Sequence, residues 1–176
     1  EFTTDPLSDV ELAWLLWATQ GVSKRLNASN ALRVVPSAGC RHAFETYLAV
    51  RGVDGLAPGL YRFLPMDWQL ARLRVHEDIA LDLALACFRQ AFVASAPVAF
   101  VWTAIPERME WRYGAAAHKV IALDAGHVCQ NLYLSCEAIG AGTCAIAAYD
   151  QQAVDQLLGV EGTDEFAVYL APVGKV

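Results

Sequence analysis

The chain has 176 residues, of which 56% are hydrophobic, and it carries a net charge of −6 at neutral pH. This length and composition allow one substantial hydrophobic core and favour a single domain over residues 1–176. The acidic balance, without any run of Lys or Arg, argues against a nucleic acid or an anionic membrane as the partner.

The first predicted helix begins after Ser8. Ser8 is a good N-cap, and Glu11 stands three residues later and completes a capping box, so we expect a helix that runs to Gly21. Trp14 and Trp17 make this helix apolar nearly all round. This pattern predicts that the helix is buried between layers of the fold or between subunits.

The polar stretch 23–36 predicts a connecting loop. It contains Asn27-Ala28-Ser29, a glycosylation sequon that we discount because nothing else indicates secretion. Residues 43–50 then alternate as a strand does, and a turn at 53–59 leads into a second strand at 60–64. These segments predict a hairpin with a loop longer than two residues.

The later segments alternate between helix and strand patterns. Helices are predicted at 77–92, 106–113 and 150–158, and strands at 98–103 and 166–173. Asp150 caps the last of these helices and Gly159 ends it. Strands interleaved with helices, together with an early hairpin, indicate an α+β fold.

A long helix is predicted upstream of Gly140. Apolar or small residues at 121, 125, 128, 132, 135, 136 and 139 give it a wide buried face, on which His127 reads as a hydrogen-bonded core histidine. Gly140 is a usual helix stop, and Gly142 and Thr143 lead into a short strand. Because small residues let a flat molecule approach the backbone closely, this turn is a candidate ligand site.

The cysteines, the mean hydropathy and the first residues of the chain indicate where the protein is found and whether it forms oligomers. The five cysteines form no C-x-x-C pair and read as buried free thiols in a reducing cytoplasm, with no metal site: Cys40, Cys87, Cys129, Cys136 and Cys144. A mean hydropathy of +0.31 is high for a monomer and predicts a two-fold dimer. The uncharged stretch 91–105 is too short for a membrane span, and the polar start without Met suggests that upstream residues are missing rather than a signal peptide.

Six segments in this order resemble the FMN-dependent nitroreductase superfamily, and the SagB-type dehydrogenases look like the closest branch. They are residues 11–22, 36–50, 55–61, 113–114, 123–146 and 169–174. The resemblance implies a nitroreductase-like α/β/α sandwich with a long central helix, which forms an obligate two-fold dimer. It also implies that FMN lies in two clefts at the dimer interface and that hydride passes through the flavin N5.

The segment Pro36-Ser37-Ala38-Gly39 resembles the family's flavin-contacting segment, in which a hydroxyl and backbone amides meet the isoalloxazine edge. Arg41 follows closely enough to place a cation near the pyrimidine carbonyls, where it would stabilise the anionic reduced flavin. His42 is the candidate proton donor beside this site. The alternative is an ordinary proline turn with a solvated arginine.

By the same resemblance, Gly140-Ala141-Gly142-Thr143 would place backbone amides beside the flavin O4 and N5, and we expect Gly142 to admit no large side chain, which any positive φ there would disfavour further. The alternative is a helix C-cap and a tight turn. Family members usually carry an Arg-Arg-Ser-x-Arg motif that binds the FMN phosphate, and this chain starts after that position. Many members also have a basic residue after the last strand, for which Lys175 is the counterpart, although a terminal lysine is usually solvated.

The prediction for function is an FMN-dependent oxidoreductase of the nitroreductase type. It would transfer hydride through flavin N5 between NAD(P)H and a small organic acceptor. One alternative is a SagB-type azoline dehydrogenase that acts on a peptide heterocycle. An alternative of another class is a non-catalytic scaffold or small-molecule binding protein without FMN. A hydrolase is disfavoured because no nucleophile motif is present.

Overall fold

An antiparallel sheet is the frame of the fold. The computed structural model of the chain describes residues 1–27 and 30–176. In this part of the chain the main sheet has six strands in the order β5-β4-β3-β6-β8-β7. The strands are β3 (Phe44–Val50), β4 (Gly59–Leu64), β5 (Gln69–Val75), β6 (Val98–Ala104), β7 (Ala141–Thr143) and β8 (Phe166–Lys175).

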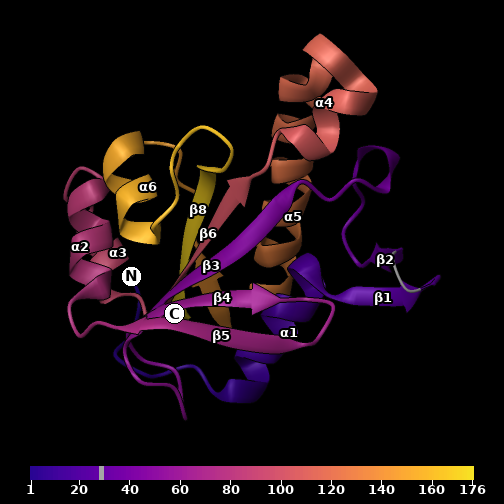
Figure 1. Ribbon diagram of the computed structural model, residues 1–176. Coiled ribbons are helices and arrows are strands. Elements are labelled where there is room, and N and C mark those ends of the chain that lie inside the picture. Colours follow the sequence, from indigo (N-terminus) through magenta and orange to yellow (C-terminus); the bar gives the residue numbers. More distant parts are fainter. Residues whose placement is uncertain (28–29) are drawn as a thin grey trace.

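Helices cover both faces of this sheet (Figure 1). On one face lie α1 (Asp9–Gln20) and α5 (Ala117–Glu137), and on the other lie α2 (Ile79–Ala86), α3 (Ala91–Ser95) and α6 (Gln151–Leu158). The strands β3 and β6 are buried along their whole length, so their side chains feed two cores. Along β6, Phe100 and Trp102 belong to the core under α1 and α5, whereas Val101 belongs to the other core. The predicted α/β/α sandwich with a long central helix is therefore confirmed.

The helix α1 begins as its sequence predicts. The Ser8 Oγ accepts a hydrogen bond from the backbone N–H of Glu11 at 3.2 Å, and the Ser8 N–H donates to the Glu11 carboxylate at 2.9 Å. The Trp14 indole donates to the Ser135 carbonyl of α5 at 3.1 Å and stacks on Trp17. Both indoles are still about two-fifths exposed, so their predicted burial between layers of the same chain is wrong, and burial between subunits stays a prediction.

Two further segments differ from the prediction. The supposed loop 23–36 contains a hairpin of β1 (Val22–Arg25) and β2 (Ala31–Arg33), whose partly exposed residues carry no hydrophobic alternation. Of the sequon, Ala28 and Ser29 lie outside the described residues. The strand β5 was not predicted, because it is a mostly exposed edge strand.

The single helix predicted at 77–92 is two short helices. The chain breaks between α2 and α3, where Phe88 and Arg89 adopt φ values of 55° and 61°. Such values are rare for residues other than glycine and end the helical hydrogen bonding. Downstream, α4 (Glu107–Tyr113) forms within the predicted range and projects beyond the sheet near the start of α5 (Figure 1).

Some predicted burials are also wrong. Cys87, Cys129 and Cys136 are buried free thiols as expected, but Cys40 and Cys144 are exposed. The His127 side chain is 52% exposed and is no core residue, because α5 turns that face away from its own sheet. Within residues 1–27 and 30–176, no helix has the length and apolarity that a membrane crossing needs.

Candidate active site

The first half of the candidate site is a tight turn, η1 (Ala38–Cys40), held by α5. The Asp124 carboxylate is 3% exposed and accepts a hydrogen bond from the Ala38 N–H, with N–O distances of 3.2 and 3.0 Å. The Ser37 Oγ accepts from the His42 N–H at 2.9 Å. Since Ser37 only accepts in that bond, its own O–H remains available to donate.

Arg41 at the end of this turn is half-buried, and its side chain has partners within the chain. Its Nε donates to the Gly39 carbonyl at 2.9 Å, and its guanidinium lies 4.6 Å from the centre of the Trp111 ring. The turn is also tightly enclosed, because a Cβ built on Gly39 would meet the Tyr113 hydroxyl at 2.7 Å. Arg41 is therefore held near the turn, in contrast to the freely solvated arginine of the alternative interpretation.

The second half is the turn that follows α5. Gly140 adopts φ +62° and ends the helical region as predicted, and Ala141 to Thr143 then pair with the end of β8. Gly142 does not adopt a positive φ and lies in the β7 ladder opposite Gly174. A Cβ there would lie 2.6 Å from Cγ1 of Val176, a side chain that is 69% exposed and can move aside.

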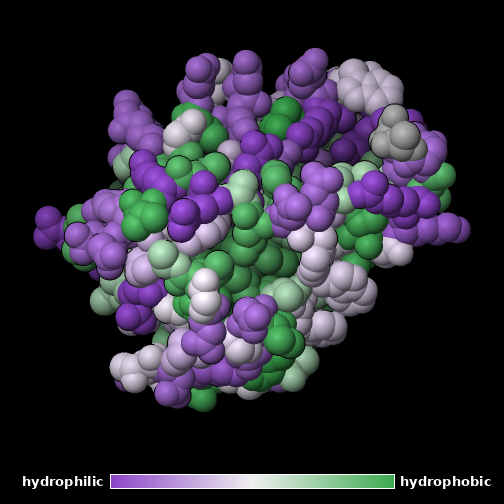
Figure 2. All heavy atoms as spheres, turned by 60° about the horizontal axis from the view of Figure 1, so that its bottom comes forward, coloured by the Kyte–Doolittle hydropathy of each residue, from purple (hydrophilic) through white to green (hydrophobic). Residues whose placement is uncertain are grey.

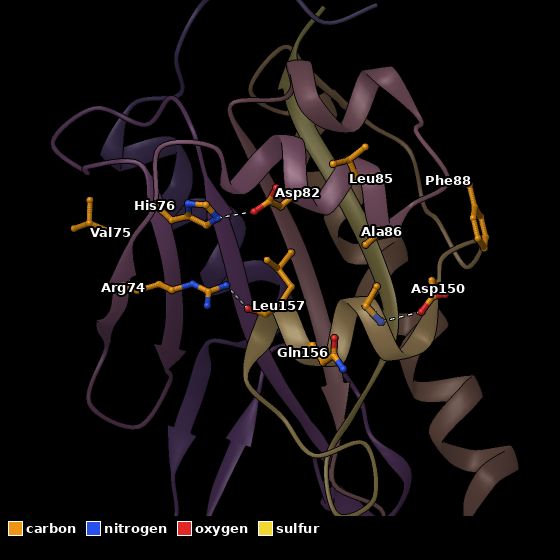
Figure 3. Close-up of a pocket in the computed structure, with 11 residues that line it drawn as sticks. Arg74, Val75, His76, Asp82, Leu85, Ala86, Phe88, Asp150, Gln156 and Leu157 are labelled. Atoms are coloured by element: carbon orange, nitrogen blue, oxygen red, sulfur yellow. Dashed lines mark hydrogen bonds and ion pairs between the residues drawn. The ribbon is translucent and has the colours of Figure 1, made fainter.

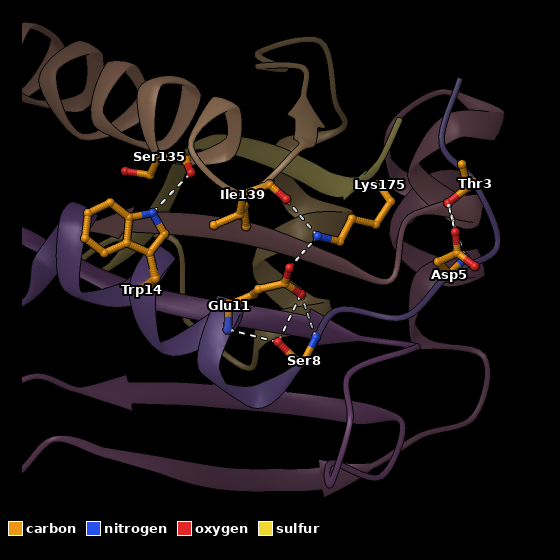
Figure 4. A network of polar contacts seen from close by, with 8 residues as sticks. All are labelled: Thr3, Asp5, Ser8, Glu11, Trp14, Ser135, Ile139 and Lys175. Atoms are coloured by element: carbon orange, nitrogen blue, oxygen red, sulfur yellow. Dashed lines mark hydrogen bonds and ion pairs between the residues drawn. The ribbon is translucent and has the colours of Figure 1, made fainter.

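Lys175 joins this second half. It is the register partner of Ala141, and its Nζ donates to the Ile139 carbonyl at 2.8 Å and forms an ion pair with the Glu11 carboxylate. Figure 4 shows the side chain reaching between the first turn of α1 and the end of α5. The Lys175 side chain is 23% exposed, so it is not the solvated terminal lysine of the alternative interpretation.

The two halves of the candidate site contact different parts of the long helix α5. Asp124 holds the first half, and Ile139, just beyond the last residue of α5, contacts Lys175 in the second. At a rise of 1.5 Å per residue, the stretch from Asp124 to Glu137 spans about 20 Å. A single chain thus does not bring the two predicted flavin-contacting segments together.

A polar pocket of about 630 Å³ lies beside the first half. We call it the arginine pocket, because its lining includes Arg33, Arg41, Arg62 and Arg108. The Glu45 carboxylate at its base is 8% exposed and pairs with Arg62 at 3.0 Å and with Arg108 at 2.6 Å. Sequence reasoning identified only Arg41 of this group, because the other members are distant along the chain and form no motif.

His42 also lines the arginine pocket. Burial and the positive charge of Arg33 lower the pKa of His42 to about 4. Its Nε2 is buried and has no hydrogen-bond partner among the described residues. The imidazole is therefore neutral at physiological pH, and it could give up a proton only from its neutral N–H.

A larger pocket of about 860 Å³ lies between β5, α2 and α6 (Figure 3). His76 Nε2 is 2.7 Å from the Asp82 carboxylate, and Arg74 donates to the Leu157 carbonyl at 2.6 Å. None of the site residues predicted from the sequence lines this pocket. It is a separate feature from the candidate site.

A third hollow is apolar and lies between α1 and the β4–β5 hairpin. Its lining includes Leu12, Leu16, Phe63 and Leu70, and its volume is about 260 Å³. Figure 2 shows the molecule from the side of α1 and β5, with apolar surface gathered in the middle of that face. This groove also contains none of the predicted site residues.

Known proteins resemble the chain over almost all of its length. A protein of Methanocaldococcus jannaschii, described as a nitroreductase, is 32% identical over 175 residues, which cover 99% of this chain and 84% of that protein. The crystal structure of a protein described as a nitroreductase from Anabaena variabilis superposes with a TM-score of 0.86 at 30% identity. That match covers 93% of this chain, which spans only about a third (34%) of the Anabaena chain.

The fold alone is shared with more distant structures. The NADPH:FMN oxidoreductase of Vibrio harveyi, in complex with NAD+, superposes with a TM-score of 0.68 at 17% identity over 99% of this chain and 63% of that chain. The narrower resemblance to the SagB-type branch stays a prediction. The Nitroreductase family as a whole matches residues 1–175. Together with the relative at 32% identity, this match shows that the chain belongs to the nitroreductase family, a family of oxidoreductases.

Proposed function

We propose that this protein is an FMN-dependent oxidoreductase that transfers hydride through the flavin N5 between NAD(P)H and a small organic acceptor. The observation that carries the proposal is the turn at Pro36–Arg41, held by the buried Asp124 in a chain of the nitroreductase family. The bound flavin would supply the redox chemistry. The protein residues would supply binding, orientation and electrostatics.

The described residues fit a flavin at the first half of the site. Ser37 retains a hydroxyl proton to donate, and Arg41 is held beside the turn by Gly39 and Trp111. A cation placed near the pyrimidine edge would favour the anionic reduced form. The second half would offer the backbone of Gly140 to Thr143, whose small residues permit a close approach.

The Lys175 ammonium is already paired within the chain. The Glu11 carboxylate already neutralises the Lys175 ammonium, and the Ile139 carbonyl accepts a second hydrogen bond from it. Lys175 is therefore proposed mainly to position the end of β8 beside the turn at Gly140. A phosphate would have to compete with Glu11 for this cation.

We also propose that the active form is a two-fold homodimer built on α5 and α1. In the single chain α5 exposes Leu123 by 55% and Leu134 by 62%, and α1 exposes Trp14 and Trp17. Exposed apolar side chains on a long helix are typical of a subunit interface. A second chain would also bring its Pro36–Arg41 turn to the first chain's Gly140–Thr143 turn.

Flavin reconstitution tests the proposed function. Purified protein incubated with FMN and then freed of unbound flavin should keep a visible flavin absorbance, and NADPH or NADH should bleach it under anaerobic conditions. Protein that keeps no FMN would contradict the cofactor. Protein that keeps FMN but is bleached by neither nucleotide would contradict NAD(P)H as the donor.

A further inference from the structure

Four arginines from separate parts of the chain meet in the arginine pocket. Arg33 ends β2, Arg41 follows η1, Arg62 lies in β4 and Arg108 lies in α4. The pocket volume of about 630 Å³ is in the range of small-molecule sites, which is larger than one inorganic ion needs. The tertiary fold therefore brings together cationic side chains from segments that are far apart in the sequence.

The pocket is cationic although the protein is acidic. Its lining carries four arginines against two carboxylates, Glu45 and Asp67, which gives a net charge of +2. The whole chain carries −6, so the remainder carries −8. His42 adds no charge at neutral pH because its pKa is lowered to about 4. The electrostatic potential at the pocket is therefore opposite in sign to that of the rest of the chain, and it favours the binding of an anion.

Glu45 orients two of the arginines. One carboxylate oxygen accepts from Arg62 and the other from Arg108, and Arg108 also donates to the His42 carbonyl at 3.3 Å. With both oxygens engaged, Glu45 fixes the planes of two guanidinium groups at the base of the pocket. Fixed guanidinium planes suit bidentate binding of a carboxylate or a phosphate.

The other two arginines have no acidic partner. Among the described residues no carboxylate lies within 4 Å of the Arg33 or Arg41 guanidinium, and the side-chain amide of Gln20 accepts from Arg33. Burial and the nearby charge of Arg108 lower the pKa of Arg33 to about 10, although the charge of Glu45 acts in the opposite direction, so Arg33 stays charged at neutral pH. A partly buried cation without a carboxylate in direct contact is stabilised further when an anion joins it.

Two buried nitrogen atoms around the pocket lack hydrogen-bond partners among the described residues. They are Nε2 of His42 and Nε of Arg62. Buried polar atoms without partners are uncommon in proteins and cost free energy. The Arg62 Nε–H is a donor, whereas Nε2 of the neutral His42 is a donor or an acceptor according to its tautomer, so one of the two atoms is an unpaired donor of fixed role.

From this arrangement we propose that the arginine pocket binds a small organic anion through a carboxylate or phosphate group, with Arg33 as the main cationic contact and with Arg62 and Arg108 held in place by Glu45. The site shares Arg41 with the proposed flavin site, but its main contact, Arg33, is not among the residues proposed to contact the flavin. Its binding can be measured without any flavin chemistry. A purely structural ion-pair network is the competing explanation, and it predicts no saturable anion binding.

The test uses citrate and inorganic phosphate as probes, titrated into the purified protein by calorimetry at constant ionic strength. The parent protein should bind at least one of them saturably at one site per chain. Arg33→Gln should weaken that binding by about tenfold or more. Arg33→Lys should weaken it less, because lysine keeps the positive charge but lacks the two parallel N–H donors of the guanidinium. Arg74→Gln is the matched control, since Arg74 lies outside the arginine pocket.

Equal affinity in the parent and Arg33→Gln would overturn the proposal, as would the lack of saturable binding of both probes to the parent. If Arg33→Gln does not fold, Arg33→Lys is the variant that tests the proposal, and unchanged affinity in that variant contradicts the bidentate contact.

Competition with NADPH and NADH shows which kind of compound carries the anionic group that the pocket binds. Displacement of the bound probe by NADPH but not by NADH would assign the site to the nucleotide's extra phosphate. Binding of the probe without displacement by either nucleotide would assign it to an acidic acceptor.

Discussion

Asp124 on the central helix and Ala38 in the turn proposed to contact the flavin are joined directly, because both oxygens of the buried carboxylate lie within 3.2 Å of the Ala38 nitrogen. This contact crosses from α5 to a turn that has little regular structure of its own. Asp124 therefore anchors the turn to the central helix.

Asp124→Ala should lower both stability and FMN affinity. The Ala38 N–H would lose its acceptor, which costs about 1–3 kcal/mol. The turn would lose its anchor at the same time. Urea unfolding and fluorescence titration with FMN measure the two effects. Asp150→Ala is the matched control, since Asp150 accepts from the Ala153 N–H at 2.8 Å in α6 and should affect stability alone. FMN affinity that falls equally in both variants would contradict a special role for Asp124.

Gly142→Val should abolish FMN binding while the dimer persists. A valine side chain there would occupy the space proposed for the isoalloxazine. It would also meet Val176, whose Cγ1 lies 2.6 Å from the Cβ position. The double variant with Val176→Ala separates the two causes, because it removes the internal clash only. If the double variant regains a melting point that rises with FMN as the parent's does, the turn is not at the flavin.

Lys175→Met should destabilise the protein most at neutral pH. Burial raises the pKa of Glu11, but hydrogen bonds from Lys175 and Ser8 outweigh it and the net pKa lies below the ordinary 4.5. A carboxyl whose pKa is lowered by folding contributes stability above its unfolded value, and this contribution is lost as pH falls through the folded value. The difference from the parent, about 1 kcal/mol at pH 7, should therefore shrink below pH 4.5. Lys119→Met, at an exposed position, is the control. A difference that stays constant with pH would show that the ion pair contributes nothing.

His42→Gln should make the protein more resistant to acid. The folded-state pKa of His42, about 4, lies below the ordinary 6.5, so the unfolded chain binds the proton more readily between these values. The parent should lose stability as pH falls from 6.5 towards 4, and above 6.5 this contribution is fully present. Chemical denaturation at several pH values measures it, with His118→Gln at an exposed site as the control. Parallel pH profiles for the parent and His42→Gln would show that His42 is not protected from protonation.

Much of the sandwich was predictable from local patterns. The capping box at Ser8, the stop at Gly140 and the strand at 98–103 each depend on residues close together in sequence. The hairpin of β1 and β2 was not predictable, because its exposed residues leave no hydrophobic period. The arginine pocket was missed for another reason: its members come from separate elements, and only the tertiary fold places them around Glu45.

The resemblance indicates the two segments that we propose to contact the flavin, but it does not indicate how far apart they lie in one chain. Their distance follows from the length of α5, which holds Ala38 through Asp124 near one end and Lys175 through Ile139 at the other. Sequence could not show that Lys175 is paired with Glu11, since the two residues lie at opposite ends of the chain. Contacts of this range are decided by packing rather than by local propensity.

The central claim is that one flavin is bound by two chains, and mixed dimers test it most directly. Gly142→Val damages the second half of the site and Asp124→Ala damages the first, so neither homodimer should retain FMN. A heterodimer of the two variants would combine the intact turn of one chain with the intact Gly142 segment of the other at one of its two sites. Sedimentation monitored at the flavin absorbance should then show one FMN per heterodimer. A heterodimer without FMN, when the parent dimer binds two, would contradict the shared site.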